Sequence, residues 1–147
     1  MRLAVVFLLS FSTVFAEARP EILDRIRDYD MRHSDLLVKI VKDPETLRYA
    51  KVRALEKMSV IYRQSKAEGE TVASRYLDGM GAGLAHKSPD VREAACTAAI
   101  VFKDSGIAPA LVGYLTRALK EENSAAVIYA CAHTLASFKK HSEVIVP

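Results

Sequence analysis

Tryptophan is absent from this chain of 147 residues, and it has only 6 glycines, 5 prolines and 2 cysteines. The scarcity of glycine and proline excludes collagen-like and low-complexity sequences. A single pair of cysteines cannot supply a multiply cross-linked scaffold or a four-cysteine zinc site. The one asparagine, Asn123, is followed by Ser124 and Ala125, which is not a glycosylation acceptor. The chain therefore has to rely on an ordinary apolar core, and 50% of its residues are hydrophobic.

A strong excess of charge of either sign is also missing. The 21 Lys and Arg residues against 18 Asp and Glu residues give a formal net charge of +3. A dedicated nucleic-acid binder would have a much larger basic excess, so no nucleic-acid partner is expected.

The N-terminus has the pattern of a secretory signal peptide. Arg2 precedes an uncharged, mostly apolar run from Leu3 to Ala16, which is too short to span a bilayer comfortably. We expect cleavage after Ala16, or alternatively after Ala18, which leaves a mature domain of residues 17–147. No cysteine follows for lipid attachment and no later run is long enough to span a membrane. The expected location is the periplasm or the extracellular space.

Helical periodicity runs through the rest of the chain, and no segment alternates like a strand. A first helix is predicted from Pro20 to Lys42, with a polar middle (Asp28 to Asp35) that favours a kink or a break. Asp43-Pro44-Glu45 predicts a second helix start, because an acidic N-cap and a proline in the first turn favour initiation. This helix should reach about Lys66, and a third should follow Gly69. Inward-facing positions of the first helix are expected at Ile22, Ile26, Tyr29, Leu36, Leu37, Ile40 and Val41.

Three further helices are predicted after Ser88-Pro89-Asp90, Ser105-Gly106 and Glu122-Asn123-Ser124. Their apolar residues follow the spacing of one wide inward face. In the fourth helix this face is Val91, Ala94, Ala95, Ala98, Ala99 and Phe102, in the fifth Ile107, Leu111, Tyr114, Leu115, Ala118 and Leu119, and in the sixth Val127, Ala130, Cys131, Thr134, Leu135 and Phe138. The sequence thus predicts an all-α domain.

These helices also repeat one another. Ser88, Val91, Ala94 and Phe102 recur 36 residues later as Ser124, Val127, Ala130 and Phe138, and a weaker echo lies 44 residues earlier, around Arg48. The segment from Ser88 to Ala95 followed by Ile107 to Leu111 resembles a HEAT-like (armadillo-type) helical repeat, most clearly over Ser88–Phe138. The resemblance implies a single α-solenoid domain of about six helices stacked as hairpins. It also places Asp90 and Arg92 at the positions of an inter-repeat ladder. Ala126 and Ile128 occupy those positions in the last unit, so the ladder should not continue there.

Two features of the sequence have more than one interpretation. Cys96 and Cys131 fall almost in register across the 36-residue repeat; they either form a disulfide or are two small buried residues that let helices pack closely. Gly79-Met80-Gly81-Ala82-Gly83 disfavours a continuous helix by about 3 kcal/mol. It is either a helix end packed closely on a neighbour or a joint between the N-terminal helices and the repeats.

Residues arranged for catalysis or metal binding are not evident. The histidines (His33, His86, His133 and His141) have no ligand spacing, and no serine lies in a nucleophile elbow. A Cys96–His133 dyad would lack a third, orienting group. We therefore predict neither an enzyme nor a bound cofactor or metal.

Two surfaces are candidates for binding. A basic face on the second helix (Arg48, Arg53, Lys57 and Arg63) suits an anionic partner, although such a row is commonly only solvated. The last helix is apolar nearly all round, and we expect Tyr129, Ile128, Ala126 and the tail residues Val144 and Ile145 to dock a partner. The tail folding back as a cap is the alternative. The leading functional hypothesis is an exported scaffold that holds another protein, as assembly factor, regulator or inhibitor. A structural homo-oligomer comes second, and an envelope hydrolase is a distant third.

Overall fold

The computed structural model describes residues 22–65 and 68–138, and within these ranges the chain forms helices and turns without a strand. The predicted signal peptide and the tail residues Val144 and Ile145 lie outside the described residues. Residues 22–28 are helical. The later helices are α2 (Ser34–Lys42), α3 (Arg48–Gln64), α4 (Gly69–Leu84), α5 (Pro89–Ala99), α6 (Ala108–Glu121) and α7 (Ala125–Ser137), with short 3₁₀ turns at Met31–His33 and Ile100–Phe102. The all-helical prediction is confirmed for this part of the chain.

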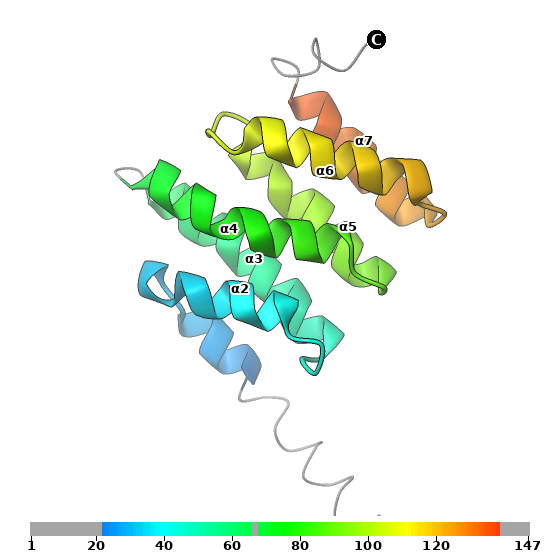
Figure 1. Ribbon diagram of the computed structural model, residues 1–147. Coiled ribbons are helices and arrows are strands. Elements are labelled where there is room, and N and C mark those ends of the chain that lie inside the picture. Colours follow the sequence, from blue (N-terminus) through cyan, green and yellow to red (C-terminus); the bar gives the residue numbers. More distant parts are fainter. Residues whose placement is uncertain (1–21, 66–67, 139–147) are drawn as a thin grey trace, which may run out of the picture.

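The helices form two rows. In one row α2 packs on α4 and α4 on α6, and in the other α3 packs on α5 and α5 on α7. Figure 1 shows the first row in front of the second, with successive helices alternating between them. Within the second row α3 and α5 run in the same direction, because Arg48 and Asp90 meet at their N-terminal ends while Tyr62 and Phe102 meet at their C-terminal ends.

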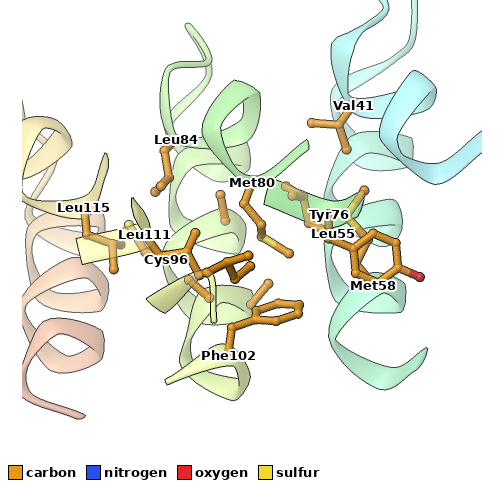
Figure 2. Packing of buried hydrophobic residues seen from close by; sticks show 14 of the residues in the cluster. Val41, Leu55, Met58, Tyr76, Met80, Leu84, Cys96, Phe102, Leu111 and Leu115 are labelled. Carbon is orange, nitrogen blue, oxygen red and sulfur yellow. The ribbon is translucent and has the colours of Figure 1, made fainter. Parts of the chain in front are cut away.

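The core lies between these rows. Tyr76 and Met80 of α4 meet Leu55 and Met58 of α3, and Phe102 closes the cluster from the end of α5 (Figure 2). The Tyr62 ring lies 4.5 Å from that of Phe102, centroid to centroid. The one polar atom of Tyr76 is satisfied, since its hydroxyl lies 2.9 Å from the Ser34 hydroxyl.

The first predicted helix is broken, as its polar middle favoured. Asp30 caps the 3₁₀ turn Met31–His33 by accepting a hydrogen bond from the Arg32 backbone N–H at 2.9 Å. Ile26, Leu37 and Val41 are buried as predicted. The prediction that Ile22 and Leu36 face inward is wrong, because 36% and 41% of their surfaces remain exposed. The break rotates α2 relative to residues 22–28, so a single helical face cannot extend across both segments.

The prediction that a helix begins at Asp43-Pro44-Glu45 is also wrong, because α3 begins at Arg48. The Asp43 carboxylate instead holds a turn: it accepts hydrogen bonds from the Glu45 N–H at 3.0 Å and the Thr46 hydroxyl at 3.1 Å. At Ser88-Pro89 the same kind of signal is confirmed, with Ser88 as N-cap and proline in the first turn of α5.

The glycine-rich segment is helical throughout, and α4 continues to Leu84. A β-carbon added at Gly83 would lie 2.9 Å from the Ala95 Cβ, and one at Gly79 would lie 3.0 Å from the Met58 side chain. The helix thus continues through the glycines despite their low helix propensity, and at Gly79 and Gly83 it packs closely against α3 and α5.

Candidate functional site

The outer face of α7 is the clearest candidate for a binding surface. Tyr129 is 75% exposed and Ile128 39% exposed, and Ala126 is exposed beside them. The 13 residues of this helix include no Asp, Glu, Lys or Arg. The ring of His133 stacks on Tyr129 with the centroids 6.2 Å apart. An exposed helix face without charge is unusual for a solvated surface and is typical of contact with another molecule.

The opposite face of α7 is held firmly against α5. Cys131 forms a disulfide with Cys96, with the two Cα atoms 5.0 Å apart. The Thr134 hydroxyl donates a hydrogen bond to the Cys96 carbonyl oxygen at 2.9 Å. The outer face is therefore presented by a helix that is covalently fixed to its neighbour. With its sulfur in the disulfide, Cys96 has no thiol to act with His133 as a nucleophilic dyad.

Asp90 and Arg92, for which the resemblance predicts a ladder, contact different parts of the chain. Asp90 of α5 pairs with Arg48 of α3, at 3.3 Å, on the exposed edge of the molecule. Arg92 makes two hydrogen bonds to the Glu122 carboxylate, of 2.6 and 2.9 Å, and two more to the carbonyl oxygens of His86 and Lys87.

Glu122 is the residue that sequence reasoning missed. Its side chain is 2% exposed, and it also accepts hydrogen bonds from the N–H groups of Asn123 and Ser124 at the start of α7. Arg92, together with these backbone donors, lowers the pKa of Glu122 to about 2, against the opposing effect of burial. The pair ties the α4–α5 connection to the α6–α7 connection. The signal in the sequence was Ala126, which stands where the resemblance implies a ladder acid, so that Arg92 would need another carboxylate.

The predicted basic face on α3 is largely engaged within the chain. Arg48 pairs with Asp90, Arg53 donates to Glu56 at 2.9 Å, and Lys57 donates to the Arg27 carbonyl oxygen at 2.6 Å. Among the side chains that the structure describes, Arg63 is the member of this face without such a contact. Carboxylates therefore offset the charges of Arg48 and Arg53, whereas Lys57, which is bonded to a neutral carbonyl, and Arg63 keep their positive charge.

Lys51 of the same helix is buried, with 2% of its surface exposed. Its ammonium donates to the carbonyl oxygens of Val41 at 3.0 Å and Asp43 at 2.6 Å. Burial lowers the pKa of Lys51, against the opposing effect of Asp43. This lysine has a structural role at the α2–α3 connection.

A groove of about 620 Å³ lies between α3 and α5, and all of its lining residues come from these two helices. Small and apolar side chains line it along both helices, and charged side chains stand at its rim. The lining residues are Val52, Glu56, Ser59, Val60, Arg63, Asp90, Glu93, Ala94, Thr97 and Ala98. Sequence reasoning did not find this groove.

A second cleft, of about 690 Å³, lies where α4 and α6 end. Its ion pairs are internal, since Lys42 pairs with Asp78 at 3.0 Å and Arg92 with Glu122. Tyr114 forms part of its wall and packs on Gly81. His86 also lines the cleft, and burial together with the neighbouring cations Lys51 and Lys87 lowers its pKa. Two cations of the cleft are thus offset by carboxylates of its own lining, and its lining residues include no serine, threonine or cysteine.

Comparisons with protein-family models, with curated proteins and with solved structures find no match to this chain. Among the described residues, no helix combines the length and apolar character that crossing a membrane requires. In the same residues, no cluster of His, Cys, Asp and Glu side chains could hold a metal ion. A functional proposal therefore rests on the geometry of α7, of the groove between α3 and α5, and of the cleft at the ends of α4 and α6.

Proposed function

We propose that this protein is an exported, HEAT-like helical-repeat scaffold that holds another protein through the outer face of α7. The single observation that carries the proposal is Tyr129, 75% exposed on a helix without a charged residue. Tyrosine is favoured at protein interfaces because its ring offers contact area while its hydroxyl can stay hydrated.

The packing of the helices supports the repeat part of the proposal. Helices two apart in the chain stack on one another in both rows, as they do in an α-solenoid. The Arg48–Asp90 pair joins successive units at the place where the resemblance puts a ladder. A disulfide between Cys96 and Cys131 suits an oxidising compartment, which supports export.

The Tyr129→Asp variant tests this function. The parent protein, purified from its native envelope fraction, should retain a stoichiometric protein partner, and the variant should lose it while its helical melt stays nearly unchanged. Leu36→Asp is the matched control, because Leu36 is an exposed apolar residue on a different helix, α2. It should keep the partner.

Three other outcomes would contradict the proposal. Retention of the partner by Tyr129→Asp would move the binding surface away from α7. Self-association of the parent without a foreign partner would favour the homo-oligomer. A monomeric parent that binds nothing and loses stability when residues 144–147 are deleted would favour a capping tail.

A further inference from the structure

The outer face of α7 is too small to be a complete interface by itself. A helix of 13 residues is about 20 Å long, at about 1.5 Å per residue. A strip of that length and about 10 Å wide offers about 200 Å², against about 800 Å² per partner in a stable complex. A partner that docks on α7 has to cover further surface, and the groove between α3 and α5 lies in the same row of helices.

We propose that the groove between α3 and α5 receives one amphipathic helix of the partner protein, running in the same direction as α3 and α5. This inference rests on the proposed function, because it assumes a protein partner. The floor of the groove suits a helix, since Ala94 and Ala98 are small and let a third helix approach closely. Val52 and Val60, on one wall, supply apolar contact, and Val60 is already 39% exposed.

The rim charges favour one direction for the bound helix. Asp90 lies in the first turn of α5 and Glu93 one turn further along it, whereas Glu56 lies at the middle of α3. Arg63 stands near the C-terminal end of α3. A helix has a partial positive charge at its N-terminus and a partial negative charge at its C-terminus. A bound helix that is parallel to α3 therefore places its N-terminus near Asp90 and Glu93 and its C-terminus near Arg63.

Two of these charges are available to a partner. Glu56 already pairs with Arg53, and Asp90 with Arg48. Glu93 and Arg63 have no ion pair or hydrogen bond in the part of the chain that the structure describes. The bound helix should thus have a basic residue near its N-terminal end and an acidic residue near its C-terminal end. Val52 and Arg63 are separated by 11 residues of helix, about 17 Å, so the helix should have at least three turns.

A second copy of this chain fits the groove less well. Among the α-helices that the structure describes, α7 is the one without a charged residue, and it has neither a basic residue near its start nor an acidic one near its end. The occupant is therefore a helix of a different protein.

Site-specific photo-cross-linking in the native cell tests the proposal on the full chain. Benzoylphenylalanine is placed singly at Val52, at Val60 and, on α7, at Ala132, and the cross-linked residues of the partner are identified by mass spectrometry. Val52 and Val60 are eight residues apart on one helix. A parallel bound helix should give partner residues about eight positions apart in the same order, whereas an extended peptide gives about four. If the Val52 variant melts lower than the parent, the exposed Glu93 serves as the N-terminal position.

The outcomes separate this inference from the proposed function. Cross-links in reverse order, at extended spacing, or to this chain itself would overturn the inference. Cross-links from Ala132 alone would overturn it and leave the proposed function standing, and none from any position would overturn both.

Charge reversal at the rim gives an independent check on the purified complex. Glu93→Lys and Arg63→Glu should each weaken binding about three- to tenfold, with a smaller effect at high salt. Glu121→Lys is the control, because Glu121 is exposed on α6 and lies outside the groove. Equal affinities for all three variants would overturn the assigned direction.

Discussion

Replacing Gly83 by alanine tests the close contact between the two rows of helices. Alanine is favoured over glycine inside a helix by about 1 kcal/mol. At this position, however, the new methyl group would lie 2.9 Å from the Ala95 Cβ and 3.1 and 3.2 Å from the methyl carbons of Leu55. The Ala95 methyl cannot rotate aside, so α4 and α5 have to separate, and overpacking of this kind costs about 1–3 kcal/mol. Gly83→Ala should therefore lower the free energy of unfolding by up to about 2 kcal/mol.

Gly113 provides the matched control within the same protein. It lies inside α6, and a β-carbon added there would meet no atom within 4 Å. Gly113→Ala should raise the free energy of unfolding by about 0.5–1 kcal/mol, since only the propensity effect remains. Urea unfolding followed by far-UV circular dichroism measures both variants. The difference between them isolates the overpacking cost. If Gly83→Ala stabilises the protein as much as Gly113→Ala does, the packing of α4 on α5 is not as close as described.

Two further predictions concern the links to α7. Because Cys96 and Cys131 are bonded across 35 residues, unfolded and unreduced protein should titrate no free thiol, and reduction should lower stability by about 3–4 kcal/mol; two free thiols would exclude the bond. The Arg92–Glu122 pair should stabilise the fold above pH 4.5, the ordinary pKa of glutamate, and its contribution should be lost as the pH falls toward about 2. Glu122→Gln should lower stability by about 1–3 kcal/mol at pH 7 and remove this part of the acid dependence, and identical unfolding curves for parent and variant at pH 7 would count against the pair.

The segments that form helices could be predicted from the sequence, because helix formation is visible in the local spacing of apolar residues. The apolar pattern of the fourth, fifth and sixth predicted helices agrees with the buried faces of α5, α6 and α7, where Val91, Leu111 and Val127 are fully buried. Helix starts were less certain, because a proline preceded by a capping residue fits a turn as well as a first helical turn. Ser88-Pro89 begins α5, whereas Asp43-Pro44 forms a turn that Lys51 secures from the following helix. That contact is eight residues away and has no signature in the local pattern.

The charges on α3 show the same limit. A sequence count treats Lys51 and Arg53 alike, yet the first is buried on backbone carbonyl oxygens and the second is exposed beside Glu56. The difference arises because Lys51 shares the inward face with Ala54 and Leu55. Its long side chain passes along this face and ends at the carboxyl end of α2, where the Val41 and Asp43 carbonyl oxygens accept hydrogen bonds from its ammonium. The position of a charge on a helix can be predicted, but its partners depend on which helix end lies opposite.

The two candidate surfaces differ for a related reason. The outer face of α7 is a property of one helix, so its lack of charge could be predicted directly from residues 125–137. The groove between α3 and α5 combines side chains from Val52 to Ala98, and it depends on the register of one helix against the other. That register is fixed by Arg48 with Asp90 at one end and by Tyr62 with Phe102 at the other. Because both contacts join residues about 40 positions apart, the groove is formed only when the second row assembles. The direction that its rim charges favour for a bound helix follows from the same register, since it places Glu93, in the first half of α5, and Arg63, in the last turn of α3, along a single trough.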